Sequence, residues 1–155
     1  MEKELMMDKV VIYWAAPLFS QAERVWNRLC ADFLETKGYE VILPQERANA
    51  YIKEGIIDFK GLVNNCYLLA LRCDIMIAVL DGPDTDSGTS LECGLRIGAK
   101  AGKIIGVRTD FRKAEDGQLN AMFRLLDHII YQSSIDESVA ILCDKIDNKI
   151  MELLK

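Results

Sequence analysis

A cluster of acidic side chains surrounds a short glycine-containing turn. The apolar run 75–80 is followed by Asp81, Asp84 and Asp86, and Glu92 stands six residues after Asp86. Short apolar runs are typical of buried strands, and open parallel sheets bind ligands beyond the carboxyl ends of their strands. The sequence therefore places these carboxylates where a site is expected.

Two of these carboxylates have a spacing that suits glycosyl transfer. Gly88 provides a sharp turn at low steric cost, and Ser87 or Thr89 is expected to cap a helix that begins there. Glu92 then lies near the positive end of the helix dipole, which favours its ionised form. Retaining glycosyl transfer uses one carboxylate as a nucleophile and a second acid nearby. The structural alternative is that the aspartates only form the turn and Glu92 only complements the dipole.

Length and composition limit the class of protein. The chain has 155 residues and a formal net charge of -5, which fits one domain over residues 1–155 and argues against nucleic acid or an anionic membrane as the main partner. No apolar run reaches the roughly 18 residues of a membrane span, and residues 1–8 lack the apolar segment of a signal peptide. Five cysteines without a Cys-x-x-Cys pair indicate free thiols and a cytoplasmic location. Because His128 is the single histidine, we expect no metal site.

Strands and helices are expected to alternate along the chain. Apolar runs predict strands at residues 9–14, 39–43, 74–80, 103–107 and 128–131. Apolar positions at helical spacing predict helices at residues 19–37, 56–72, 89–101, 119–126 and 133–154. This alternation is typical of an α/β fold with a parallel sheet that is covered on both faces.

Connecting segments of distinct composition follow three of the predicted strands. Small residues from Ala15 onward leave room beyond the first strand. Residues 45–55 have no clear period, and they are either a flexible cover over a site or a plain connection. The polar loop 108–118 contains Arg108 and Arg112, which we expect to be solvated loop charges rather than ligands of an anion.

Several short motifs occur in the order and spacing of one enzyme family. They are Ile12-Tyr13, Ala15-Ala-Pro-Leu-Phe-Ser20, Leu43-Pro-Gln45, Cys73-Asp74, Asp81-Gly82, Asp86-Ser-Gly-Thr-x-x-Glu92, Arg108-Thr-Asp-Phe-Arg112 and Asn120-Ala-Met122. Over roughly residues 9–131 the chain resembles the nucleoside 2-deoxyribosyltransferase family. The resemblance implies a flavodoxin-like three-layer sandwich with a five-stranded parallel sheet. It also implies ping-pong exchange of the base between a 2′-deoxynucleoside and a free nucleobase, in purine and pyrimidine salvage, without a metal or cofactor.

The resemblance further implies roles for individual residues. Glu92 matches the nucleophile that attacks C1′ and holds the deoxyribosyl group covalently, which divides one difficult displacement into two easier ones. Asp86 matches the aspartate that binds the sugar hydroxyls near the leaving base, and Tyr13 matches the tyrosine that orients the nucleophile. Phe19 matches an aromatic residue that stacks on the base, and Asn120 matches an asparagine that reaches the sugar's 5′ end from a neighbouring subunit, so a homo-oligomer is expected. The remaining expected substrate-binding residues are Ala15, Gly88 and Asp81.

Two positions bear on the alternatives to base transfer. Cys66 occupies a position, eight residues before Asp74, that is often acidic in the family, which bears on base preference and transfer efficiency. A sister branch hydrolyses deoxynucleoside 5′-monophosphates and carries a phosphate-binding serine where this chain has Asp86, whose charge would repel a phosphate. The alternatives are an N-glycosidase that hydrolyses deoxynucleosides or their 5′-monophosphates, and a non-catalytic nucleoside-binding module.

Overall fold

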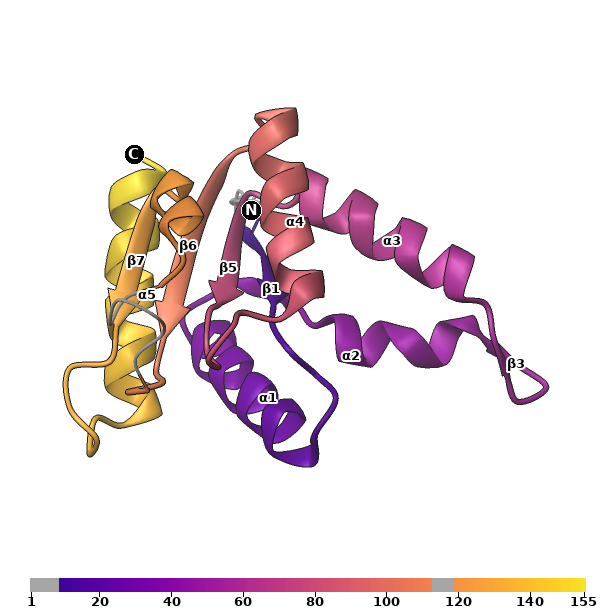
Figure 1. The fold of residues 1–155 in the computed structure, drawn as a ribbon, viewed down its shortest axis with the longest axis horizontal. Coiled ribbons are helices and arrows are strands. Elements are labelled where there is room, and N and C mark those ends of the chain that lie inside the picture. Colours follow the sequence, from indigo (N-terminus) through magenta and orange to yellow (C-terminus); the bar gives the residue numbers. More distant parts are fainter. Residues whose placement is uncertain (1–8, 113–118) are drawn as a thin grey trace, which may run out of the picture.

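A five-stranded parallel sheet forms the centre of the protein (Figure 1). The computed structural model describes residues 9–112 and 119–155. The strands of the sheet are β1 (Val11–Ala15), β2 (Glu40–Ile42), β5 (Ile75–Val79), β6 (Lys103–Arg108) and β7 (His128–Tyr131). Their spatial order is β2-β1-β5-β6-β7, which is the flavodoxin-like order. The predicted α/β fold class is therefore confirmed.

Helices cover both faces of this sheet (Figure 1). The helices are α1 (Gln21–Thr36), α3 (Phe59–Arg72), α4 (Ser87–Ala99), α5 (Val139–Leu153) and the 3₁₀ helix η2 (Ala121–Leu125). Helices α1 and α5 contribute to one core, and α3, α4 and the end of η2 contribute to the other. Within the described segments, no helix combines the length and the hydropathy needed to cross a bilayer.

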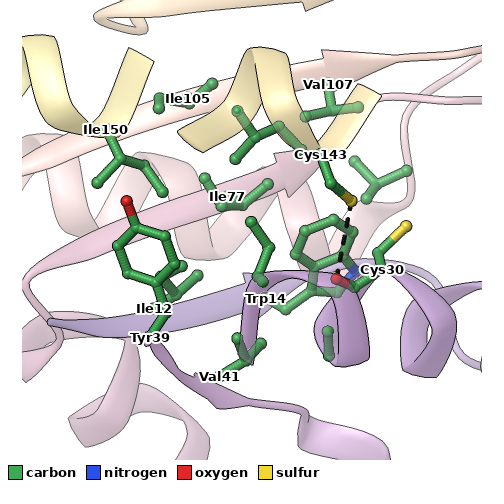
Figure 2. Packing of buried hydrophobic residues seen from close by; sticks show 14 of the residues in the cluster. Ile12, Trp14, Cys30, Tyr39, Val41, Ile77, Ile105, Val107, Cys143 and Ile150 are labelled. Atoms are coloured by element: carbon green, nitrogen blue, oxygen red, sulfur yellow. Dashed lines mark hydrogen bonds between the residues drawn. The ribbon is translucent and has the colours of Figure 1, made fainter. Parts of the chain in front are cut away.

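The core beneath α1 and α5 is built around fully buried side chains of β1. Ile12 and Trp14 point into it (Figure 2). Tyr13 between them belongs to the core on the opposite face, as strand geometry requires. The thiol of Cys143 lies 3.7 Å from the carbonyl oxygen of Cys30, so α5 and α1 are in direct contact. Fully burying one large apolar side chain stabilises the fold by about 1.5–3 kcal/mol. All five cysteines are free thiols, as the cysteine pattern predicted.

The segment after β2 forms an arm with its own secondary structure. It contains α2 (Pro44–Arg47), the 3₁₀ helix η1 (Ala48–Tyr51) and an antiparallel hairpin of β3 (Ile52–Lys53) and β4 (Ile56–Ile57). Glu54 and Gly55 form the hairpin turn with φ values of 52° and 79°. Positive φ at both central residues is the type I′ geometry of tight hairpins. The segment 45–55, whose sequence has no clear period, therefore contains short regular elements, and the hairpin projects beside the start of α3 (Figure 1).

Three predicted helices differ from the structure by three or more residues at their start, or in their type. Helix α3 begins at Phe59 rather than at residue 56, and α5 begins at Val139 rather than at residue 133. Asp58 and Ser138 fix these starts, because their side chains accept a hydrogen bond from the backbone N–H three residues later. The short helix predicted at residues 119–126 is the 3₁₀ helix η2.

Candidate active site

The candidate site lies at the point where the connections of the sheet change direction. Strand β1 lies between β2 and β5, so the chain leaves it first toward one edge of the sheet and later returns on its other side. Open α/β sheets bind ligands outside the carboxyl ends of their strands at such a switch point. Tyr13 comes from β1 and Glu92 comes from α4, the helix that follows β5. The topology therefore brings together two residues that are 79 positions apart.

Tyr13 and Glu92 form a direct hydrogen bond. The Tyr13 hydroxyl donates to Oε1 of Glu92 over 2.6 Å. Burial, and next the charge of Glu92, raise the pKa of Tyr13 far above its ordinary value of 10.0, so the phenol stays protonated and remains a donor. Burial also raises the pKa of Glu92 above its ordinary 4.5; the Tyr13 hydrogen bond opposes this rise and the charge of Asp86 adds to it. The carboxylate is thus desolvated, held in one orientation and close to a second acid.

Asp86 caps the helix that carries Glu92. Its Oδ2 accepts from the backbone N–H of Thr89 over 2.9 Å and from the Thr89 hydroxyl over 3.3 Å. The cap predicted at Ser87 or Thr89 is therefore wrong, because the carboxylate of Asp86 reaches the free N–H groups from one position earlier. A Cβ atom at Gly88 would lie 3.1 Å from Oδ2 of Asp86, so glycine leaves room for this cap.

Hydrogen bonds to Asp81 connect the loop after β5 with the loop after β6. Its carboxylate accepts from the backbone N–H groups of Thr109, over 2.6 Å, and Asp110, over 3.0 Å, and from the Thr109 hydroxyl. Oδ2 of Asp110 accepts in return from the backbone N–H of Gly82 over 3.0 Å. The structure therefore places Asp81 in the scaffold that holds the rim of the site.

Arg108 belongs to the same scaffold, although the sequence favoured a solvated charge. It is only 6% exposed, and its guanidinium donates to the carbonyl oxygens of Leu80, of Gly82 over 2.9 Å and of Arg112 over 2.8 Å. The prediction is wrong because β6 continues through Arg108, which places this side chain under the loops. Arg112 is the solvated charge that was expected, with 70% of its side chain exposed.

The remaining predicted substrate-binding residues differ in their exposure to solvent. Ala15 ends β1 and is fully buried. Phe19 is 75% exposed in the loop between β1 and α1. The exposed Asn120 caps η2, since its Oδ1 accepts from the backbone N–H of Met122 over 3.0 Å. Residues 113–118 of the loop predicted at 108–118 lie outside the described residues, as do residues 1–8.

A buried amide holds the loop that carries Phe19. Asn27 is 3% exposed, and its Nδ2 donates to the carbonyl oxygen of Pro17 over 3.0 Å and to Oε1 of Gln45 over 3.1 Å. Its Oδ1 accepts from the indole N–H of Trp14 over 3.1 Å. Hydrogen bonds inside a protein are electrostatically stronger than in water, so this network rigidly joins the loop after β1 to the segment after β2.

Cys66 completes the surroundings of Tyr13. Its thiol, on α3, is a hydrogen-bond neighbour of the Tyr13 hydroxyl, and it also feels the charge of Glu92. Burial raises the pKa of Cys66 above its ordinary 9.0, so the thiol is neutral. A position that is often acidic in the resembled family therefore carries an uncharged group here.

Comparison with known proteins gives one family match and several structural likenesses. The family model described as nucleoside 2-deoxyribosyltransferase matches residues 12–137. A conserved protein from Enterococcus faecalis V583 is 25% identical, with a TM-score of 0.71, over 91% of this chain and 99% of that chain. A 2-deoxyribosyltransferase from Bacillus psychrosaccharolyticus is 18% identical, with a TM-score of 0.67, over 89% of this chain and 90% of that chain. The CMP N-glycosidase BcmB of Clostridium botulinum is 20% identical, with a TM-score of 0.59, over 88% of this chain and 98% of that chain.

These findings differ in what they show. No curated protein matches the chain. The likeness to the transferase and to the N-glycosidase, each at low identity, shows the shared fold. The family model, in contrast, covers most of the sequence and includes Tyr13, Asp86 and Glu92. The chain therefore belongs to the nucleoside 2-deoxyribosyltransferase family.

Proposed function

We propose that this protein exchanges the base of 2′-deoxyribonucleosides through a deoxyribosyl ester on Glu92. The observation that carries the proposal is the 2.6 Å hydrogen bond from Tyr13 to Glu92 at the switch point of the sheet. Asp86 is close enough for its charge to raise the pKa of Glu92, which gives the pair of acids that retaining glycosyl transfer uses. Family membership supports the same class of reaction.

In the first half-reaction the carboxylate of Glu92 attacks C1′ of the sugar. A C1′–O bond forms while the C1′–N bond breaks, and the base leaves with the electron pair and takes up a proton from water. Tyr13 holds one carboxylate oxygen by its hydrogen bond and stays protonated throughout. In the second half-reaction a nitrogen of the incoming base attacks C1′ and the base gives up its proton to water, while the C1′–O bond breaks and Glu92 leaves as a free carboxylate. Covalent capture thus preserves the sugar between two bases.

Other side chains are proposed to bind the substrate around this centre. Asp86 holds a sugar hydroxyl near the leaving base, and its negative charge favours free nucleosides over 5′-monophosphates. Phe19, which is 75% exposed, stacks on the base. Gly88 presents a small surface to the sugar, the fully buried Ala15 lies behind the site at the end of β1, and Asn120 acts in the site of a neighbouring subunit. Such an exchange serves the salvage of purine and pyrimidine bases.

Hydrolysis is the second candidate function. The exposure of Phe19 leaves the base-binding side open to water, and the neutral thiol of Cys66 provides a weaker hydrogen-bond partner for a second base than an acid would. Water instead of a base would then resolve the ester. A CMP N-glycosidase with the same fold agrees with this alternative.

Product analysis by chromatography tests the proposal. The protein is incubated with deoxyinosine, with and without excess adenine, beside Glu92→Gln and the control Glu40→Gln, which changes an exposed glutamate on the edge strand β2. We expect deoxyadenosine from the wild type and from Glu40→Gln, and none from Glu92→Gln. Intact-mass analysis of the acid-quenched protein should show a deoxyribosyl adduct that Glu92→Gln lacks.

Each other outcome of this experiment points to a different function. Hypoxanthine with free deoxyribose, in amounts that adenine does not change, assigns hydrolysis. If deoxyinosine is not turned over, the same incubation with deoxynucleoside 5′-monophosphates follows, and turnover of these alone assigns the nucleotide N-glycosidase. Binding without turnover, equal in the wild type and in Glu92→Gln, assigns a nucleoside-binding module and contradicts the proposal.

A further inference from the structure

Arg47 is the last residue of helix α2, in the arm that follows β2. It is exposed, and its guanidinium forms no ion pair and no hydrogen bond with any residue that the structure describes. Arg28 on the neighbouring helix α1, in contrast, is held by the carboxylates of Asp32, Glu35 and Glu46. The N–H donors of the Arg47 guanidinium therefore remain available to a ligand.

The two residues before Arg47 fix the direction in which its side chain leaves the helix. Nε2 of Gln45 donates to the carbonyl oxygen of Arg24 over 2.9 Å. Oε1 of Glu46 accepts from the guanidinium of Arg28 over 2.9 Å. Both partners belong to α1. Successive residues of a helix are about 100° apart around its axis, so when Gln45 and Glu46 face α1, the side chain of Arg47 points away from α1.

The side of α2 that faces away from α1 is the side of α3. The 3₁₀ helix η1, which follows α2 directly, packs against α3, and α2 lies between α1 and α3 (Figure 1). On α3 the thiol of Cys66 interacts with two charges, that of Glu92 and that of Arg47. The guanidinium and the proposed nucleophile therefore lie near the same side chain.

Helix α2 is also joined to the loop that carries Phe19. The buried amide of Asn27 donates to Oε1 of Gln45 on α2. The same amide nitrogen donates to the carbonyl oxygen of Pro17, two residues before Phe19. One buried side chain thus fixes both segments, so a base that stacks on Phe19 has the helix of Arg47 beside its edge.

We propose that Arg47 selects 6-oxopurine bases, hypoxanthine and guanine, by donating one hydrogen bond to O6 and one to N7. The inference rests on the proposed function, in which C1′ lies at Glu92 and the base extends from it toward Phe19 and α2. The planar fork of a guanidinium fits this pair of acceptors. Adenine also offers N7, but an amino group replaces O6, so one N–H of Arg47 would face another donor.

The same contact assists the departure of the base. When the C1′–N bond breaks, the base keeps the electron pair, and negative charge spreads over its ring and O6. Donors that point at developing charge stabilise the transition state. The guanidinium of Arg47 gives up no proton in this step, since the base takes its proton from water. The Cys66 thiol is neutral because burial raises its pKa, so it does not compensate the charge of Arg47 as a carboxylate would.

Competition between two substrates tests the proposal. Equimolar deoxyinosine and deoxyadenosine are incubated with the protein and an excess of diaminopurine as the common acceptor, and the initial rates at which they are consumed are compared. Their ratio is the ratio of the two kcat/KM values, in which the amount of active protein and the acceptor step cancel. We expect the wild type to consume deoxyinosine at least about 10-fold faster, and Arg47→Met to lose this preference, because one bidentate contact discriminates between bases about 10- to 100-fold.

The matched control is Lys53→Met, which removes one positive charge from the exposed strand β3 of the same arm. This variant should keep the preference for deoxyinosine. Circular dichroism establishes that the variants are folded, and Arg47→Gln replaces Arg47→Met if the latter does not fold. A wild type without preference overturns the proposal. A preference that Arg47→Met keeps, or that Lys53→Met loses equally, also overturns it.

Failure of the proposed function is a separate outcome. If the wild type consumes neither nucleoside, the proposed function fails, and calorimetric titration of both nucleosides into the wild type and Arg47→Met then tests the recognition alone. We expect deoxyinosine to bind at least about 10-fold more tightly than deoxyadenosine to the wild type, and equally tightly to Arg47→Met. Equal affinities in the wild type, or no binding of either nucleoside, overturn the assignment of Arg47.

Discussion

The hydroxyl of Tyr13 lies 2.6 Å from Oε1 of Glu92, and this contact joins the first strand of the sheet to the helix that follows β5. Burial raises the pKa of Glu92, whereas the Tyr13 hydrogen bond lowers it. The ionisation of the proposed nucleophile is therefore a balance between desolvation and one donor. Removal of the Tyr13 donor should raise the pKa of Glu92, and removal of the nearby charge of Asp86 should lower it. The two variants should therefore shift the pH dependence of the reaction in opposite directions.

Tyr13→Phe removes the donor and leaves the burial unchanged. Hydrogen bonds to charged groups contribute about 1.5–3 kcal/mol, so kcat should fall about 10- to 100-fold. The acid limb of the profile of kcat/KM against pH should move to higher pH, because the pKa of Glu92 loses the interaction that lowers it. The matched control is Tyr39→Phe, which removes a 2.6 Å hydrogen bond to Asp147 on the other face of the sheet. An equal shift of the acid limb in both variants would contradict the assignment of Tyr13 as the donor that lowers the pKa of Glu92.

Asp86→Asn should move the acid limb in the opposite direction. The charge of Asp86 raises the pKa of Glu92, and asparagine removes that charge while its side-chain oxygen still accepts from the backbone N–H of Thr89. Stability should change by less than about 1 kcal/mol, since the helix cap is kept. We expect an acid limb at lower pH together with a raised KM. A profile identical to that of the wild type would show that Asp86 does not act on Glu92.

Glu92→Gln should stabilise the protein at neutral pH. Because burial raises the pKa of Glu92 in the folded state, the folded protein binds more protons than the unfolded chain between pH 4.5 and that raised pKa. Wild-type stability therefore falls as pH rises through this interval. Glutamine removes the dependence, so the variant should gain on the order of 1 kcal/mol at pH 7 and lose this advantage below about pH 4. Urea unfolding at both pH values measures the difference, and a variant that is less stable at pH 7 would contradict the sign.

Arg108→Met should destabilise the fold by about 2–4 kcal/mol, because three carbonyl oxygens beyond β5 and β6 lose their donor. Arg112→Met is the control, since 70% of the Arg112 side chain is exposed and its ion-pair partner Asp110, which is 10% exposed, keeps the backbone N–H of Gly82 as a donor. Loss of this ion pair should change the free energy of unfolding by less than about 1 kcal/mol. Chemical denaturation of both variants tests the contrast, and equal losses would show that Arg108 has no special role.

The sequence by itself determined the features that depend on near neighbours. Apolar runs and helical spacing located all five strands of the sheet and the main helices, since burial periodicity acts over a few residues. The ordered motifs from Tyr13 to Glu92 also indicated the family that the model match shows. Neighbouring residues did not decide which side chain caps α4, nor that Glu54 and Gly55 close a hairpin, because the competing local choices differ by little energy.

Only the tertiary structure decided which distant groups share an environment. Arg108 reads as a solvated charge in its own loop, and it is buried because carbonyl oxygens from the loop after β5 surround it. The contact of Tyr13 with Glu92 likewise depends on the placement of β5 beside β1, after β2 has taken the other side. Strand order is set by the packing of both faces of the sheet at once, and packing of residues 79 positions apart leaves no local pattern in the chain.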